Sequence, residues 1–301
     1  MRLCLGTVQF GMRYGIRGQR QPDLAQAVHM LYYAVEHGIG DIDTAYAYGT
    51  AEEVVGTFLR ERGAGREKLS ITSKLKPNIL EHERPEAYYR VIKANLEESL
   101  ARLHTDYLDG YYFHTPQYVF CEEAVEAMAR LKREGYVKSA GVSAYEPEEV
   151  KQGLQNPLIE RIQFPFSVFD QRMQREGIFA QRGAEQTILH TRSAFIQGLL
   201  FMSEAEVPPF LQEAVPILRS LDEVGEQYGY SRLELAMGYV KAQPGIECLV
   251  FGVDDIEQLK EDIAVFQKEL PQEIVDVLGE RFCSVKADIV MPSLWKLKKE
   301  M

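Results

Sequence analysis

The feature that most constrains this chain is a regular alternation of short apolar runs with longer amphipathic segments. Nearly continuous apolar runs of this kind are typical of strands in a parallel sheet that is covered on both faces. On this pattern we predict strands over Leu3–Gly6, Gly40–Asp43, Leu69–Ser73, Tyr107–His114, Val137–Ser143, Arg161–Phe164, Thr187–His190 and Cys248–Gly252.

The longer segments carry apolar residues three and four positions apart, which places these residues on one face of a helix. In the segment Pro85–His104, for example, Ile92, Leu96, Leu100 and Leu103 form one apolar stripe. By this criterion we predict helices over Asp23–His37, Ala51–Arg62, Pro85–His104, Glu122–Glu134, Glu213–Tyr228, Leu233–Ala242 and Ile256–Gln267.

Strands that alternate with helices favour parallel pairing, and the eight predicted strands in 301 residues match a (β/α)8 TIM barrel. A doubly wound open sheet is the alternative, but it calls for a Gly-x-Gly-x-x-Gly turn after a strand, and the chain has none. The nearest stretch, Gly63-Ala64-Gly65-Arg66, follows a helix and is interpreted as a plain loop. We therefore expect a single barrel domain over residues 1–301, with a C-terminal helix and tail from about residue 271.

Charge and composition exclude several classes of partner. The net charge is −11, and a strongly acidic surface lacks the basic footprint that nucleic acid or anionic membranes require. The chain has no run of 18 apolar residues, and its first residues reach turn formers too early for a signal peptide. The four cysteines (Cys4, Cys121, Cys248 and Cys283) show no close pair and no metal-ligand spacing, so we expect buried, reduced thiols in a cytoplasmic protein. The oligomeric state stays open.

Polar side chains recur where the predicted strands end. In a barrel of this type the chemistry lies at the C-terminal ends of the strands, so these residues are candidates before any motif is considered. They are Asp43 and Tyr48 after the second strand, Lys74 after the third, His114 at the fourth, Ser143 at the fifth, Gln163 at the sixth, Arg192 and Ser193 after the seventh, and Gly252 after the eighth.

Four of these residues, Asp43, Tyr48, Lys74 and His114, suit the reduction of a carbonyl group. No side chain donates hydride, so a cofactor must supply it, and a tyrosine can supply the proton. The pKa of a free tyrosine is about 10, and we expect the Lys74 ammonium to lower the pKa of Tyr48. Asp43 can keep Lys74 charged, and His114 can hydrogen-bond the substrate oxygen and orient it.

Each of the four also has an ordinary structural interpretation. Asp43 could cap a helix, Tyr48 could fill a turn, Lys74 could be solvated and His114 could simply end a strand. Four such coincidences at one rim of one barrel are improbable, so we interpret the four as a catalytic set.

Ordered motifs along most of the chain resemble the aldo-keto reductase family. The earlier motifs are Leu5-Gly6-Thr7 with Gly11, Asp43-Thr44-Ala45 with Tyr48-Gly49, Ile71-Thr72-Ser73-Lys74, and Leu108-Asp109 followed by His114. The later motifs are Gly141-Val142-Ser143, Gln163-Phe164-Pro165-Phe166-Ser167, Arg192-Ser193 with Gln197-Gly198-Leu199-Leu200, and Gln258-Leu259. Each motif is weak alone, but the ordered set is highly specific. The start of the chain and Pro292-Ser293-Leu294-Trp295 are similar to a bacterial branch of the family.

The resemblance implies an enzyme that uses NADPH or NADH to reduce a small-molecule aldehyde or ketone. The similarity to the bacterial branch implies a sugar-like substrate. It implies that Tyr48 is the proton donor, that Lys74 and Asp43 tune it, and that His114 orients the carbonyl. It also implies a cofactor-binding set of Gly6, Thr7, Asp43, Ser143, Gln163, Arg192, Ser193, Gln197, Gly252, Asp254, Gln258 and Asp262.

Three positions depart from the family pattern. Arg192 stands where many relatives carry an aromatic ring stacked on the nicotinamide, and Ala144 replaces the asparagine common after the serine. Asp254 occupies the place of the usual basic residue near the adenosine phosphate, and the neighbouring Asp255 can cap the helix that follows. The segment Gly252–Gln258 offers carboxylates and no cation, so we predict no strong preference for NADPH over NADH.

Two other functions stay open on the sequence. The altered Arg192, Ala144 and Asp254 would fit a non-catalytic redox sensor that binds a nicotinamide cofactor on the same fold. The complete catalytic set favours an enzyme, because a sensor has no need for a tuned proton donor. A metal-assisted hydrolase is less favoured and no metal is expected, because the six histidines show no ligand pairing at i, i+3 or i+4.

Overall fold

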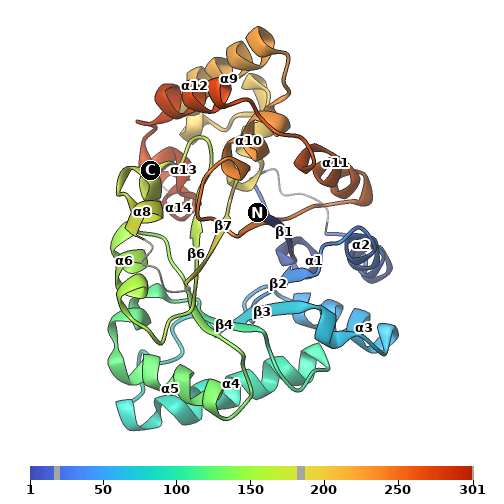
Figure 1. Ribbon diagram of the computed structural model, residues 1–301, viewed down its shortest axis with the longest axis vertical. Helices are drawn as coiled ribbons and strands as arrows, with labels where there is room; N and C mark the ends of the chain where they lie inside the picture. Colours follow the sequence, from blue (N-terminus) through green and yellow to red (C-terminus); the bar gives the residue numbers. More distant parts are fainter. Residues whose placement is uncertain (17–20, 182–186, 300–301) are drawn as a thin grey trace.

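The strands form a closed parallel barrel in which each strand pairs with the next along the chain and β8 pairs with β1 (Figure 1). The structure is a computed structural model that describes residues 1–16, 21–181 and 187–299. This order confirms the predicted (β/α)8 barrel. The strands are β1 (Arg2–Gly6), β2 (Asp41–Asp43), β3 (Ser70–Lys74), β4 (Gly110–Phe113), β5 (Ala140–Ser143), β6 (Arg161–Pro165), β7 (Ile188–Arg192) and β8 (Cys248–Phe251).

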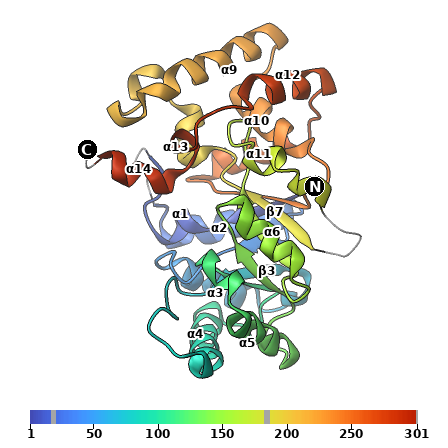
Figure 2. The same ribbon diagram turned by 90° about the vertical axis from the view of Figure 1, so that its left-hand side faces the viewer.

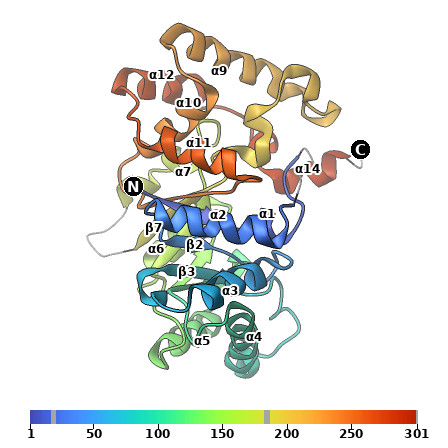
Figure 3. The same ribbon diagram turned by 90° about the vertical axis from the view of Figure 1, so that its right-hand side faces the viewer.

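Helices cover the outside of the barrel, as the views in Figures 1 and 3 show. Their apolar faces pack on the outward-facing strand residues, which are almost entirely buried. The α-helices are α1 (Val8–Gly11), α2 (Leu24–Glu36), α3 (Ala51–Arg62), α4 (Tyr88–Leu103), α5 (Glu122–Arg133), α6 (Pro147–Gln155), α7 (Arg172–Arg175), α8 (Ile178–Gln181), α9 (Val215–Tyr228), α10 (Arg232–Lys241), α11 (Ile256–Phe266), α12 (Gln272–Phe282), α13 (Ala287–Val290) and α14 (Pro292–Lys299).

The structure corrects the prediction at three elements. The strands predicted over Tyr107–His114 and Val137–Ser143 are shorter, because β4 covers Gly110–Phe113 and β5 covers Ala140–Ser143, and Leu108 and Val137 form only an isolated bridge before them. The helix α6 between β5 and β6 was missed. Its start carries a clear signal, since Pro147 occupies the first turn and Glu146 forms a capping box with Glu149.

The C-terminal segment packs back onto the barrel unit. Helices α9 and α12 lie side by side, and α14 reaches the edge of the barrel near α1 (Figures 2 and 3). Ile274 and Leu278 of α12 and Trp295 of α14 belong to the same hydrophobic core as the strands. Pro292 and Ser293, at the start of α14, line the pocket at the C-terminal ends of the strands.

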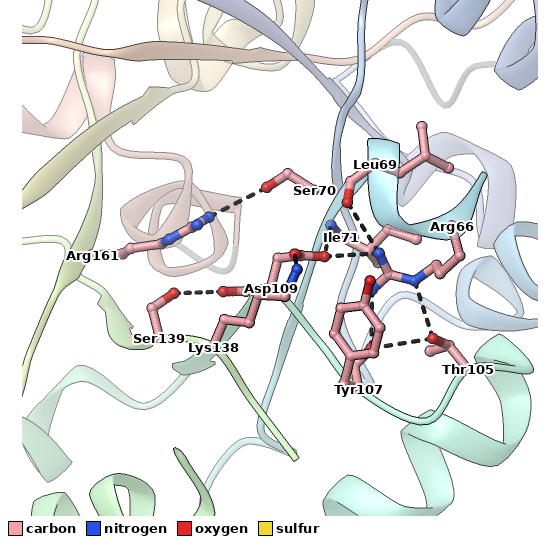
Figure 4. A network of polar contacts seen from close by, with 10 residues as sticks. All are labelled: Arg66, Leu69, Ser70, Ile71, Thr105, Tyr107, Asp109, Lys138, Ser139 and Arg161. Atoms are coloured by element: carbon pink, nitrogen blue, oxygen red, sulfur yellow. Dashed lines mark hydrogen bonds and ion pairs between the residues drawn. The ribbon is translucent and has the colours of Figure 1, made fainter. Parts of the chain in front are cut away.

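The N-terminal ends of β3, β4 and β5 are joined by one network of charged groups around Asp109 (Figure 4). Its carboxylate accepts from the Arg66 guanidinium at 2.8 Å and the Ile71 amide at 3.0 Å, and pairs with the Lys138 ammonium at 2.8 Å. Burial would raise the pKa of Asp109, but these three donors outweigh it and hold that pKa below its usual value. Polar residues at this face therefore serve stability, and the chemistry lies at the opposite face.

The interior of the barrel is unusually polar. Side chains at alternate strand positions point inward, and the rings of Tyr112 on β4 and His190 on β7 face each other across the barrel at 6.5 Å. Neither ring nitrogen of His190 has a hydrogen-bond partner among the described residues. Burial, and then the charges of Arg161, Arg2 and Lys74, lower the pKa of His190 to about 3.

We expect the protein to lose stability as the pH falls below about 6.5. The folded state holds His190 neutral down to about pH 3, whereas the unfolded chain takes up a proton near 6.5. Each pH unit inside this window removes up to about 1.4 kcal/mol, and the contribution is complete only above it. Urea unfolding at pH 7 and pH 5 should show a smaller difference for His190→Leu than for the wild type. An unchanged difference would contradict the assignment, and exposed His29→Asn is the control.

The cysteines follow the prediction only in part. All four are free thiols. Cys4 on β1 and Cys248 on β8 are buried neighbours, although they are far apart in the sequence. The expectation that every thiol is buried is wrong for Cys283, which is exposed just beyond α12, and for Cys121, which is half-buried. Within the described residues no group of His, Cys, Asp or Glu has the arrangement of a metal site. In the same part of the chain, no helix is long and apolar enough to cross a membrane.

Candidate active site

A pocket of about 890 Å³ opens at the C-terminal ends of the strands. It brings together residues from the ends of β1, β2, β4, β5, β7 and β8 with residues from α10, α11 and the C-terminal tail. Of the predicted site residues, its lining includes Gly6, Thr7, Asp43, Tyr48, His114, Ser143, Arg192, Ser193, Gln197, Gly252, Asp254, Gln258 and Asp262. The two others, Lys74 and Gln163, are fully buried and contact Asp43.

Lys74 joins Asp43 and Tyr48, two of the other predicted catalytic residues, into one hydrogen-bonded group. Its ammonium donates to the Asp43 carboxylate at 2.5 Å, to the Thr44 carbonyl at 2.9 Å and to the Tyr48 hydroxyl at 3.4 Å. The Lys74 side chain is fully buried and that of Asp43 is nearly so. A buried ammonium needs such partners, because an unpaired charge is costly to remove from water. The predicted contacts of Lys74 with Asp43 and Tyr48 are confirmed.

Two glycines fix the position of the Tyr48 loop. A Cβ atom on Gly11 would lie 1.8 Å from the Tyr48 carbonyl oxygen, and one on Gly49 would lie 2.3 Å from the Gly11 carbonyl oxygen. Gly49 also has φ of 59°, a backbone conformation that favours glycine. The amide of Thr50 donates to the Gly11 carbonyl at 3.2 Å and closes this contact. The loops after β1 and β2 are thus packed backbone against backbone, which places the phenol at the pocket.

The pKa of Tyr48 moves in the direction opposite to the one we expected. Burial raises the pKa of Tyr48 well above its ordinary value, and the Asp43 charge raises it further. The Arg192 charge lowers this pKa but does not reverse the rise. Burial and the Asp43 charge together outweigh the positive charge near the phenol. The phenol therefore keeps its proton at physiological pH, which is the form an acid needs.

His114 faces Tyr48 across the pocket, with ring centres 5.7 Å apart and the planes nearly perpendicular. Burial lowers the pKa of His114 to about 3, with further lowering by the charges of Lys74 and Arg192. The imidazole is therefore neutral at physiological pH. A neutral imidazole has one N–H to donate, so it can hold a carbonyl oxygen without competing to protonate it.

Gln163 and Ser143 are the residues that the resemblance assigns to the carboxamide of the cofactor. The Gln163 amide donates to Asp43 at 2.7 Å, while its buried Oε1 atom has no partner among the described residues. Ser143 is nearly fully buried and lines the pocket beside it. A carboxamide could donate its N–H to the unpaired Gln163 oxygen and accept a hydrogen bond from the Ser143 hydroxyl. The residues present therefore fit a nicotinamide group.

The far end of the pocket is acidic. Asp254, Glu261 and Asp262 all line it, and burial raises the pKa of Asp262 to about 8, with a further contribution from Glu261. Asp255 caps α11 instead, since its side chain accepts from the Gln258 amide at 2.9 Å. Sequence reasoning missed Glu261. Its signal is its position immediately before Asp262 on the same helix.

Arg232 is the cation at this acidic end, and it is already engaged. Its guanidinium pairs with the Asp222 carboxylate at 2.5 Å and donates to the carbonyls of Leu200 and Met202, both at 2.8 Å. These bonds orient the Arg232 guanidinium, and it would have to break them to bind a phosphate.

Two aromatic residues at the catalytic end were also missed. Tyr14 and Tyr145 line the pocket with Arg192, and the Gln197 amide donates to the Tyr14 hydroxyl at 3.1 Å. The Arg192 guanidinium lies over the Tyr145 ring at 4.4 Å. Tyr145 comes two residues after Ser143, a position that the strand-end rule would have selected if it had been extended into the loop.

The same geometry belongs to a known family. The sequence profile described as Aldo/keto reductase family matches residues 2–280. This chain belongs to the aldo-keto reductase family. Members of this family use nicotinamide cofactors, and the catalytic residues predicted above occupy the expected end of the barrel.

Relatives of known sequence and structure agree with this membership. An uncharacterised oxidoreductase of Bacillus subtilis, YqkF, is 28% identical over 84% of this chain and 86% of its own length. A glyoxal reductase of Bacillus subtilis is 25% identical over 83% of this chain and 82% of its own length. A thermostable aldo-keto reductase, Tm1743, whose crystal structure holds the inhibitor epalrestat, is 27% identical in sequence. Its structure aligns with a TM-score of 0.69 over 93% of this chain and 94% of its own. The chain is thus an oxidoreductase of this family.

Proposed function

We propose that this enzyme reduces an aldehyde or ketone to an alcohol at the expense of NADH or NADPH, with Tyr48 as the proton donor. The observation that carries the proposal is the buried Lys74 ammonium, which donates to both Asp43 and Tyr48. A structural ion pair needs no phenol at the mouth of a pocket, whereas an acid catalyst does. The redox-sensor alternative gives no reason for this contact.

The bound cofactor would supply the hydride for the carbonyl carbon, held near Ser143 and Gln163. On the protein side, the neutral His114 donates to the carbonyl oxygen and aligns it with the Tyr48 hydroxyl. Because Lys74 occupies one lone pair of the phenol oxygen, the phenol proton is free to point into the pocket. As that proton moves to the substrate oxygen, the Lys74 ammonium stabilises the phenolate that forms.

The direct test of this proposal is oxidation of NADH and NADPH in the presence of a panel of aldehydes and ketones, including glyoxal, methylglyoxal and simple sugars. Turnover of any of these substrates supports the proposal. Tight cofactor binding without turnover on the whole panel would favour the sensor instead.

We expect no strong preference for NADPH, meaning a difference in Kd below about 100-fold, or about 2.7 kcal/mol. The 2′-phosphate of NADPH needs a cation, but the described residues at the acidic end include Asp254, Glu261 and Asp262, and Arg232 is already paired with Asp222. Asp254→Arg should tighten NADPH binding by about 10-fold or more relative to NADH. Both affinities can be measured by fluorescence titration at fixed ionic strength.

The matched control for this change is Glu257→Arg. Glu257 is in the first turn of α11, three residues after Asp254, but it is exposed and pairs with Lys260 at 2.8 Å outside the pocket. It adds the same charge without facing the cofactor. If the Asp254 and Glu257 variants shifted the two affinities equally, the assignment of Asp254 to the ribose end of the cofactor would be wrong.

A further inference from the structure

The catalytic end of the pocket contains a cation, Arg192, that the proposed reduction itself does not use. Arg192 ends β7 and lines the pocket together with Tyr48 and His114. The charge of Lys74 is neutralised by Asp43, whereas the ion pairs among the described residues do not include Arg192. The catalytic end of the pocket therefore carries an uncompensated positive charge.

Among the described residues, the groups that hold the guanidinium are neutral. It donates to the Ala144 carbonyl at 3.1 Å and to the Ser193 hydroxyl at 3.3 Å, and it lies over the Tyr145 ring. These contacts orient the planar group without cancelling its charge, and they use only part of its N–H donors. A fixed guanidinium fork matches the paired oxygens of a carboxylate or phosphate.

The charge of Arg192 reaches the reacting groups. It adds to the burial that lowers the pKa of His114, and it opposes the burial that raises the pKa of both Tyr48 and Tyr14. The acidic residues on α11 and in the loop before it form no ion pair with Arg192 in the described structure. A ligand bound beside Tyr48 therefore lies in the field of this charge.

We propose that Arg192 determines substrate specificity by binding an anionic oxygen group, a carboxylate or a phosphate, of the carbonyl substrate. This inference rests on the proposed reductase function and narrows its substrate class. A half-buried cation without a counter-charge is unfavourable, and a substrate anion would relieve this in the complex. The polar side chains of Tyr14, Ser193 and Gln197 would surround the same group.

The test compares pairs of related substrates in which one member carries the anionic group and the other is uncharged. One pair is 4-carboxybenzaldehyde and its methyl ester, and the other is glyceraldehyde 3-phosphate and glyceraldehyde. The kcat/KM ratio of the anionic to the neutral member should exceed one in the wild type for at least one pair. The pair with the larger ratio identifies carboxylate or phosphate. Arg192→Gln should lower that ratio by about 10-fold or more, and Arg192→Lys should lower it less.

An equal charge ratio in the wild type and Arg192→Gln would overturn the proposal. If NADH and NADPH binding were weakened in the same variant, the Arg192 charge would belong to the cofactor site instead. Arg130→Gln, which removes an exposed arginine paired with Glu134, controls for net charge.

A binding arm separates this proposal from the reductase function. If no carbonyl compound is reduced, the proposed function fails, and calorimetry with terephthalate and its uncharged dimethyl ester then tests Arg192 alone. Terephthalate that binds the wild type more tightly than Arg192→Gln, by about 10-fold or more, supports the anion site without turnover. Equal affinities would reject it.

Discussion

Tyr48→Phe should lower kcat by about 100-fold or more while leaving the fold and cofactor affinity nearly unchanged. The substitution removes one hydroxyl, whose contact with the protein is the 3.4 Å bond from Lys74. Lys74 keeps its bonds to Asp43 and the Thr44 carbonyl, so the buried charge stays compensated. The lost function is the proton for the substrate oxygen. Steady-state kinetics on any accepted aldehyde, with cofactor titration alongside, measures both quantities.

The control for this variant is Tyr107→Phe. Tyr107 lies at the N-terminal face of the barrel, where its ring is covered by Arg66 and Lys138 at 4.2 and 4.5 Å. A Tyr48→Phe enzyme with kcat within about threefold of the wild type would remove Tyr48 from the role of general acid.

Lys74→Met should both inactivate the enzyme and destabilise it by about 3–5 kcal/mol. The methionine fills the space but leaves the Asp43 carboxylate buried, with the Gln163 amide as its remaining side-chain donor. Turnover should fall by about 100-fold or more, because the phenolate of Tyr48 loses its stabilising ammonium. Urea unfolding and steady-state kinetics measure the two effects.

The double variant Asp43→Asn with Lys74→Met separates stability from catalysis. It removes both charges, so much of the lost stability should return while activity stays low. Exposed Lys76→Met, just beyond the same strand, should change stability by no more than about 0.5 kcal/mol. A loss below about 1 kcal/mol for Lys74→Met would show that Asp43 does not depend on this ammonium.

Most of the catalytic set could be predicted because each residue is tied to the end of a strand. The alternation of apolar runs fixes a parallel barrel, and parallel strands end at one rim. Asp43 and Lys74 end β2 and β3, which pair directly, so their contact at 2.5 Å follows from adjacency. The same reasoning does not reach Tyr14 or Glu261. These residues enter the pocket from a loop and from an outer helix, whose paths depend on packing rather than on strand order.

The sequence by itself determined the fold class, the end of the barrel that carries the site and the residue types gathered there. Only the tertiary structure decided the electrostatics. An ammonium alone would lower the pKa of Tyr48, but the fold buries the phenol and places Asp43 beside it, so that pKa rises. In the same way the fold places Arg192 against Tyr145 with no counter-charge among the described residues, although the chain as a whole is strongly acidic. Charge interactions depend on distance and burial in three dimensions, and neither is encoded in the local pattern of residues.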